Sequence, residues 1–302
     1  MLFRSGPTYP DCPQLSPAPN SCNLRLCSKF RIHGEVFLSK MVPPMSLPKP
    51  QGLEILHDDG LSLVLNKQGG LLTQGPPDVD SVEYRLKHWF RQQNPKAKKI
   101  YCGVPHRLDR PVSGAMVFCR NPEGTRHISG QFQHRSVEKV YWAVVKGEVN
   151  PVSGTWTDFM RKLPDQAKSE TCNEQHPDAQ LARLKYQVLT QNEDLSWLKI
   201  RLETGRTHQI RVQASSRGWP ILGDQLYDST VPFGPELADL RTRWIALHAR
   251  SLTFDHPTLN KRLTIEAPLY EAWRPLADQI DAGCPEVQHA VQEAILPPST
   301  TL

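Results

Sequence analysis

Apolar and polar residues alternate with a period of two over much of the chain between residues 50 and 280. Successive side chains of a β-strand point to opposite faces, so this period predicts strands. Residues 137–149 are a clear example, with Lys139 and Tyr141 on one face and Val140 and Trp142 on the other. We therefore expect a strand there that presents two different surfaces.

Short apolar runs bounded by turn residues mark the other expected strands. Two strands flank an Asp-Asp-Gly turn in residues 53–72, and a buried strand follows in residues 114–120. Residues 182–205 predict a hairpin, and residues 244–256 and 261–268 predict two further strands. Most of these strands follow one another directly along the chain, which favours antiparallel pairing.

Helices are expected in fewer places. Residues 81–93 carry apolar side chains at four-residue spacing, which is typical of a helix with one buried face, and residues 126–134 predict a second helix. The segment 207–218 fits either a strand or a helix. We favour a helix, because Thr207 is a good N-cap and Gly218 can close the far end.

Strands thus outnumber helices, and the sequence predicts an α+β fold with a largely antiparallel mixed sheet and flanking helices. We place one globular domain at residues 49–282. Residues 1–48 are rich in proline and small polar residues and are expected to be a disordered extension. Residues 283–302 are expected to form a C-terminal tail with one weak helical pattern.

Composition restricts the class of protein. The apolar runs are shorter than the 18 or so residues of a membrane-spanning helix, and the proline-broken N-terminus predicts no secretory signal. Seven cysteines, an odd number without a Cys-x-x-Cys pair, predict neither a disulfide framework nor a zinc site. We expect a protein of the reducing cytoplasm that has no membrane partner.

The chain carries 36 Lys and Arg residues against 31 Asp and Glu residues, a formal charge of +5. This excess is modest, and it indicates a nucleic-acid partner only where the positive charge gathers. One such run is residues 86–99, which is either a contact for phosphate or the solvated end of a helix. Its basic members are Lys87, Arg91, Lys96, Lys98 and Lys99.

Reactive side chains are concentrated in residues 103–116, GVPHRLDRPVSGAM, where His106, Arg107 and Asp109 lie between two prolines. An Asp with a pKa of about 3.9 is ionised at neutral pH and can act as nucleophile, base or ligand. The alternative is a carboxylate that only caps a turn. Prolines stiffen the segment and Gly114 permits close approach of another backbone, which favours an active-site loop.

Two further groups of residues could accompany Asp109. Arg206 and Arg211 bracket the start of the expected helix, where they form either an anion site or a solvated surface. Tyr141 is either a core residue or an aromatic platform for a base, and Lys139 on the same face could then contact a phosphate. The sequence alone leaves both pairs of alternatives open.

Other chemistries fit the sequence less well. His106, Asp109 and His208 could ligate a metal, but they lack the spacing of a metal-binding motif. Phosphate-binding loops, dinucleotide fingerprints and the Gly-x-Ser-x-Gly elbow are absent from the sequence. A sugar hydrolase would need a second carboxylate; Asp224 stands out, and we interpret it as a turn residue. We therefore expect an Asp-dependent enzyme without cofactor or metal.

The chain resembles the RluA-type pseudouridine synthases over about residues 52–275. HRLDRPVSG resembles the family's signature around its catalytic aspartate, and KVYWAVVKG resembles its second motif. TGRTHQIRV together with PILGDQLY resembles its third motif. LVLNKQGGLL and ALHARSLTFDHP match flanking family segments, so the motifs occur in the family's order.

This resemblance implies an enzyme that isomerises uridine in ribosomal or transfer RNA within a central catalytic cleft. Asp109 would be the nucleophile, Tyr141 would stack on the uracil, and Arg211 would hold the carboxylate ionised. It further implies a monomer that needs no nucleotide cofactor; the competing hypothesis is an RNA-binding protein of the same fold without activity. The expected substrate-binding residues are His106, Arg107, Lys139, Arg206 and His208.

Overall fold

The computed structural model describes residues 50, 52–280 and 283–293. All described residues belong to one compact unit. The expected Pro-rich extension, residues 1–48, therefore lies outside the described residues. Among the described residues, no helix combines the length and apolar character needed to cross a bilayer.

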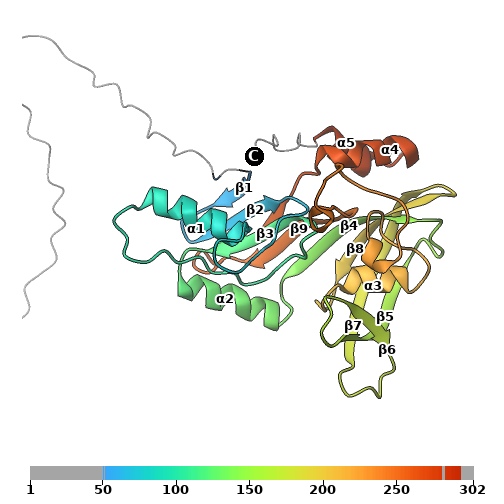
Figure 1. The fold of residues 1–302 in the computed structure, drawn as a ribbon, viewed down its shortest axis with the longest axis horizontal. Coiled ribbons are helices and arrows are strands. Elements are labelled where there is room, and N and C mark those ends of the chain that lie inside the picture. Colours follow the sequence, from blue (N-terminus) through green and yellow to red (C-terminus); the bar gives the residue numbers. More distant parts are fainter. Residues whose placement is uncertain (1–49, 51, 281–282, 294–302) are drawn as a thin grey trace, which may run out of the picture. The chain divides into compact units, whose positions relative to one another are not determined.

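The described strands form one ten-stranded sheet with the order β1-β2-β3-β9-β4-β8-β7-β5-β6, and β10 pairs with β9 (Figure 1). Every pairing is antiparallel except that between β3 and β9. The predicted α+β class with a largely antiparallel mixed sheet is thus confirmed. The strands are β1 Glu54–Asp58, β2 Ser62–Lys67, β3 Ser113–Cys119, β4 Glu138–Lys146, β5 Ser153–Lys162, β6 Ser169–Cys172, β7 Gln180–Gln191, β8 Leu195–Leu202, β9 Leu247–Asp255 and β10 Arg262–Glu266.

Helices cover both faces of the sheet, because its strands alternate two sets of buried side chains. Leu65 of β2 belongs to the main core with Leu86 of α1, whereas Val64 belongs to a second core with Ile128 of α2. The predicted helices at residues 81–93 and 126–134 correspond to α1 and α2. The helices are α1 Val82–Gln93, α2 Pro122–Gln133, α3 Gln209–Ser215, α4 Arg274–Ile280 and α5 Pro285–Gln292.

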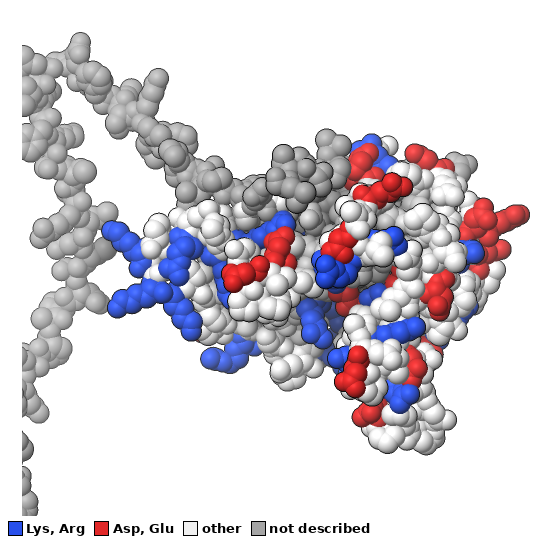
Figure 2. Space-filling view, viewed as in Figure 1, with Lys and Arg blue, Asp and Glu red and all other residues white. Residues whose placement is uncertain are grey.

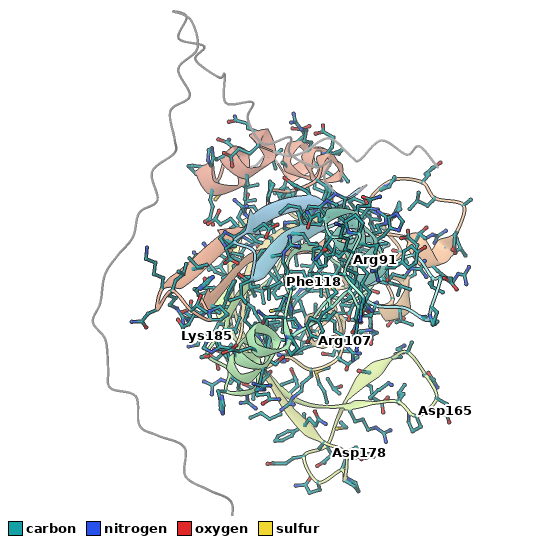
Figure 3. The ribbon with its side chains drawn as sticks, turned by 90° about the vertical axis from the view of Figure 1, so that its left-hand side faces the viewer. Arg91, Arg107, Phe118, Asp165, Asp178 and Lys185 are labelled. Carbon is teal, nitrogen blue, oxygen red and sulfur yellow. The ribbon has the colours of Figure 1, made fainter. Side chains whose placement is uncertain are left out.

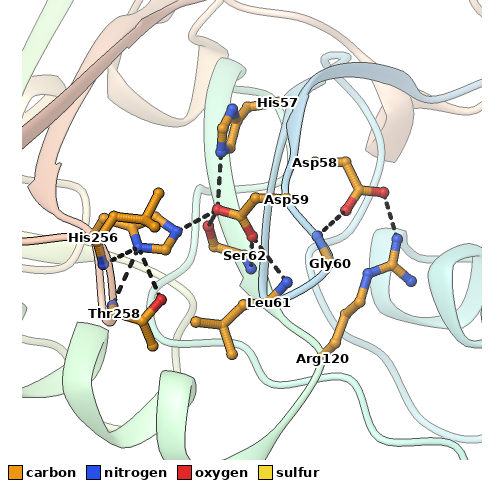
Figure 4. A network of polar contacts seen from close by, with 10 residues as sticks. His57, Asp58, Asp59, Gly60, Leu61, Ser62, Arg120, His256 and Thr258 are labelled. Atoms are coloured by element: carbon orange, nitrogen blue, oxygen red, sulfur yellow. Dashed lines mark hydrogen bonds and ion pairs between the residues drawn. The ribbon is translucent and has the colours of Figure 1, made fainter. Parts of the chain in front are cut away.

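The Asp-Asp-Gly turn joins β1 and β2 as predicted, and it is also tied to the turn after β9 (Figure 4). Asp59 accepts hydrogen bonds from the backbone N–H groups of Leu61 at 2.8 Å and Ser62 at 2.6 Å. Its other oxygen contacts the Nε2 atoms of His57 at 3.0 Å and of His256 at 2.5 Å. Burial raises the pKa of Asp59, but its hydrogen bonds outweigh this effect and hold the pKa below its usual range.

The parallel junction of β3 and β9 lies near the middle of the sheet and depends on Gly114. This residue has a φ of +116°, and a Cβ there would lie 2.3 Å from the carbonyl oxygen of Ala249. Only a residue without a side chain permits this approach, so the predicted role of Gly114 is confirmed. The junction brings the segment before β3, which contains Asp109, beside β9 and its other neighbour β4.

The helix predicted at residues 207–218 is present as α3, but its predicted N-cap is wrong. The helix begins at Gln209, after His208, which has a left-handed backbone with a φ of +57° and gives no side-chain cap. The Gln209 side chain organises the preceding loop instead, because its Oε1 accepts hydrogen bonds from Thr204 Oγ1 at 2.7 Å and from Arg206 N at 3.0 Å. Gly218, with a φ of +82°, follows the last turn as predicted.

Strands β5 and β6 had no counterpart among the sequence predictions. With β7 they form the end of the sheet beyond β8, and Figure 3 shows Asp165 and Asp178 on the loops that join these strands, away from the rest of the chain.

At the other end of the sequence, α5 carries Val287 and Ala290, which are buried in the main core. The expected boundary near residue 283 therefore does not coincide with an edge of the core.

Candidate active site

A cleft of about 290 Å³ opens where the segment before β3, strand β4 and the start of α3 meet. All eight residues predicted to act in catalysis or substrate binding line this cleft, although they come from three distant parts of the sequence. Phe132 at the end of α2 and Leu202 of β8 complete its walls. The predicted residues are His106, Arg107, Asp109, Lys139, Tyr141, Arg206, His208 and Arg211.

The backbone around Asp109 is fixed by neighbouring main chain and by one buried lysine. Gly70 N donates to the carbonyl of Arg110 at 2.8 Å, and Arg110 Nε donates back to the carbonyl of Gly70 at 2.9 Å. Val112 N donates to the carbonyl of Asp109 itself at 3.1 Å. Lys67 Nζ reaches the carbonyl of Arg110 at 3.1 Å from the end of β2. The carboxylate therefore projects from a segment whose backbone is already ordered.

Asp109 is held by Arg211, as predicted, and Arg211 is held in turn by a second carboxylate. Arg211 Nη1 lies 3.3 Å from Asp109 Oδ2. Its Nε and Nη2 donate to the two oxygens of Asp224 at 2.6 and 2.8 Å, a bidentate pair. Burial lowers the pKa of Arg211, but the hydrogen bond and charge of Asp224 and the charge of Asp109 outweigh it and raise the pKa. The guanidinium therefore stays charged beside Asp109.

Asp224 has a larger role than the turn residue inferred from the sequence. Its side chain is 2% exposed, whereas that of Asp109 is 27% exposed. Both oxygens of Asp224 are engaged by Arg211, and Asp224 does not line the cleft. Asp109 is thus the accessible carboxylate of the pair, and Asp224 orients the arginine.

His208, which contacts the hydroxyl of Tyr227, makes a second contact with the Asp109 carboxylate. His208 Nε2 lies 3.6 Å from Asp109 Oδ2, and its Nδ1 lies 2.8 Å from the hydroxyl of Tyr227. Burial lowers the pKa of His208, although the charge of Asp109 opposes this. The Tyr227 ring also lies 4.9 Å from the guanidinium carbon of Arg211, a cation–π contact. The sequence analysis assigned no role to Tyr227, although it is the last residue of the PILGDQLY motif.

Aromatic rings form the walls of the cleft. Tyr141 lies on β4, and burial together with the negative charge of Asp109 raises the pKa of its phenol, so the ring is neutral. His106 stacks on Phe132 with ring centres 4.5 Å apart. Its Nε2 accepts a hydrogen bond from Val117 N at 3.0 Å, and burial lowers the pKa of His106 to about 3. His106 is therefore a neutral ring fixed to the backbone, unsuited to donating protons near neutral pH.

Three cationic side chains lie around the cleft. Arg107 is exposed, whereas Lys139 and Arg206 are partly buried. Arg206 Nε donates to the carbonyl of Leu181 at 2.9 Å, which leaves the other guanidinium nitrogens for a ligand. Among the residues that the structure describes, no cluster of three or more His, Cys, Asp or Glu side chains has a metal-binding arrangement. The site thus offers one accessible carboxylate, stacking surfaces and positive charge.

Comparison with known proteins identifies the family. Residues 62–216 match the family model described as RNA pseudouridylate synthase. The chain is 32% identical to the dual-specificity RNA pseudouridine synthase RluA of Vibrio cholerae, over 73% of this chain and 84% of that protein. It is 31% identical to the ribosomal large subunit pseudouridine synthase D of Pseudomonas aeruginosa, over 72% of this chain and 69% of that protein.

A solved structure, human RNA pseudouridylate synthase domain containing 4, shares the fold with a TM-score of 0.60. It is 23% identical in sequence, and the match covers 80% of this chain and 94% of that one. The fold and the family match agree with the resemblance carried by the motifs around Asp109, Tyr141 and Arg211. The chain therefore belongs to the RluA-type RNA pseudouridine synthases, which isomerise uridine to pseudouridine in RNA.

Proposed function

We propose that Asp109 is the nucleophile of this isomerisation and that its substrate is a structured ribosomal or transfer RNA. The observation that carries the first part is the accessible Asp109 carboxylate, paired with a buried arginine inside the cleft. The second part is supported by the relatives, of which one is named for the large ribosomal subunit and another for dual specificity. The cytoplasm as the place of action stays a prediction.

The reaction needs no net change of electrons. The bond between C1′ of the ribose and N1 of the uracil breaks, the base turns over, and a bond forms between C1′ and C5. The proton lost from C5 is balanced by one gained at N1. Asp109 can assist by attack on the ribose or on the base, and the geometry is compatible with either route. The detached uracil must be retained meanwhile, which the aromatic side chains that line the cleft favour.

The target uridine must leave its stack to reach Asp109, at a cost of a few kcal/mol. In this proposal Tyr141 offsets that cost by stacking on the uracil, a contact worth about 1–3 kcal/mol per base. His106, stacked on Phe132, also lines the cleft. Arg107, Lys139, Arg206 and His208 contact the ribose and phosphates. Arg211 pairs with Asp109 and fixes its direction, because both oxygens of Asp224 hold the guanidinium in place.

The assignment of Asp109 is tested by the Asp109→Asn variant. We expect this variant to lose tritium release from RNA labelled at C5 of uridine while it binds the same RNA with an affinity close to that of the wild type. Asp165→Asn, on a loop of the β5–β7 end of the sheet, is the matched control and should keep full activity. Near-normal turnover by Asp109→Asn would contradict the proposed nucleophile. Comparing pseudouridines in cellular RNA with and without this protein identifies the substrate.

A further inference from the structure

The C-terminal end of α2 has an arginine at a position that favours glycine. Ser136 N donates to the carbonyl of Gln131 at 3.0 Å, and Arg135 N donates to the carbonyl of Phe132 at 3.2 Å. These two bonds form a Schellman motif, in which the residue in the left-handed conformation is usually glycine. Here that residue is Arg135, with a φ of +58°. A side chain in this conformation is strained, and such strain is concentrated at functional sites.

Arg135 lies beside the mouth of the cleft. Phe132, whose carbonyl binds the Arg135 backbone, lines the cleft together with Lys139 and Arg206. The ammonium group of Lys139 lies 3.6 Å from the position of a Cβ at Gly205, the residue before Arg206. Burial, and after it the charge of Arg135, lower the pKa of both Lys139 and Arg206. Lys139 and Arg206 therefore line one part of the cleft, and Arg135, just after the helix that ends in its wall, is close enough for its charge to act on both.

These three cations lack a partner acid among the described residues. Within the described part of the chain, no carboxylate forms an ion pair with Arg135, Lys139 or Arg206. The acid nearest in sequence, Glu138, is engaged at 3.2 Å by Arg201 and also at 3.2 Å by Arg262. Three like charges without an acid repel one another, and a bound anion relieves that repulsion.

We propose that Arg135, Lys139 and Arg206 bind the backbone phosphate of a nucleotide next to the target uridine, and that the strained Arg135 serves this contact. This inference rests on the proposed function, because it requires that the target base enter the cleft beside Asp109. A base turned into the cleft leaves its flanking phosphates at the mouth, where the three cations lie. The phosphodiester is the anion that RNA presents there.

The Arg135→Gly variant separates binding from folding, because the two should change in opposite directions. Glycine relieves the left-handed conformation, so we expect Tm to rise by about 2 to 4 °C. RNA affinity should fall about tenfold, and the slope of log affinity against log salt should become shallower by about 0.7–0.9, the value of one phosphate contact. Arg126→Ala, which removes an exposed positive charge from the same helix, is the control and should leave the slope unchanged.

A neutral methylphosphonate placed at each linkage around the target uridine locates the phosphate. We expect one linkage at which the wild type loses clearly more affinity than Arg135→Gly does, and equal losses for the two proteins at every other linkage, a coupling that a merely structural residue would not give. Additive losses at every linkage, or a slope equal to that of Arg126→Ala, would overturn the inference. If the wild type itself does not isomerise uridine, the proposed function is refuted instead. The two failures are therefore distinguishable.

Discussion

At the scale of single residues, the site depends on how one guanidinium is divided between two carboxylates. Asp224 takes the two nitrogens of Arg211 that form a fork, and Asp109 takes the remaining Nη1 at the longer distance of 3.3 Å. Arg211 itself is almost fully buried. A buried arginine fixed by one carboxylate presents a charge of defined direction to the other, so the direction of the Asp109 carboxylate is fixed.

This arrangement predicts different defects for the two arginines of the third motif. Arg211→Ala should lower the single-turnover rate at saturating enzyme by about a hundredfold or more, because Asp109 loses its partner. Arg206→Ala should mainly weaken RNA binding, since Arg206 touches no catalytic carboxylate. Arg211→Lys should restore only part of the rate, because it keeps the charge and loses the planar fork. Single-turnover rates and affinities measured with the same RNA distinguish the two arginines. A reversed pattern would show that the roles of Arg211 and Arg206 are exchanged.

The sequence predicts these residues unequally. Asp109 stands in a segment whose composition is informative by itself, whereas the roles of Tyr141 and Arg211 followed from the resemblance of their motifs to the family. Asp224 and Tyr227 contribute as much to the geometry, but their role depends on a short turn that folds back onto α3, and no periodicity signals such a contact. Asp224 therefore looked like a turn former, which is the more frequent use of Asp beside Gly.

At the scale of elements, β2 ends in a lysine that fastens the active-site segment. Lys67 is fully buried, and its Nζ donates to the carbonyls of Gln68 at 2.9 Å, Leu71 at 2.7 Å and Arg110 at 3.1 Å. Burial lowers the pKa of Lys67 to about 7, against the opposing charge of Asp109. An amine is thus retained in the core, where it holds three carbonyls around the loop that carries the nucleophile.

Lys67 should consequently make stability depend on pH. Its folded pKa lies below its unfolded value of 10.5, so between about pH 7 and 10 the unfolded chain binds more protons than the folded chain. In this window the stability of the wild type, relative to Lys67→Met, should rise with pH by about 1 kcal/mol per pH unit. Denaturant unfolding of both proteins at several pH values measures the difference. A difference that stays constant or falls would show that Lys67 remains charged throughout.

The elements themselves were predictable where one simple period dominates. Helix α1 follows from its four-residue apolar spacing, and β4 follows from its two-residue alternation. The start of α3 was not predictable, because a left-handed His208 and the side chain of Gln209 replace the expected Thr207 cap. Strand β5 escaped notice because most of its side chains are exposed or half-buried at the end of the sheet.

At the scale of the described unit, charge is distributed unevenly. Figure 2 shows one face of this unit. Lys and Arg gather at the end of the face that carries α1 and α2, whereas Asp and Glu are most frequent at the opposite end. The segment after α1 contributes Lys96, Lys98 and Lys99, all of them exposed. No ion pair with a described acid engages these three lysines, whereas Lys87 pairs with Glu83 at 2.6 Å.

The segment after α1 leads directly to the active-site loop. Seven residues lie between Lys99 and Arg107, so the two lie within about 30 Å of each other even if the chain is fully extended. An RNA whose target uridine occupies the cleft could therefore place a neighbouring helical arm on these lysines. We therefore predict that the run between residues 86 and 99 contacts RNA in its second half, whereas its first half is an ordinary helix surface.

Neutralising Lys96, Lys98 and Lys99 together to Gln tests this extension of the binding surface. Because each lost phosphate contact reduces the salt dependence by about 0.7–0.9, the slope of log affinity against log salt should become shallower by about 2 to 3. The defect should appear with an RNA that carries an additional arm and vanish with a minimal stem-loop, while the rate at saturating enzyme stays unchanged. The control replaces the exposed Lys146, Lys185 and Lys261 with Gln and should leave the slope unchanged with either RNA. Equal slopes for the two triple variants would assign the run to plain solvated surface.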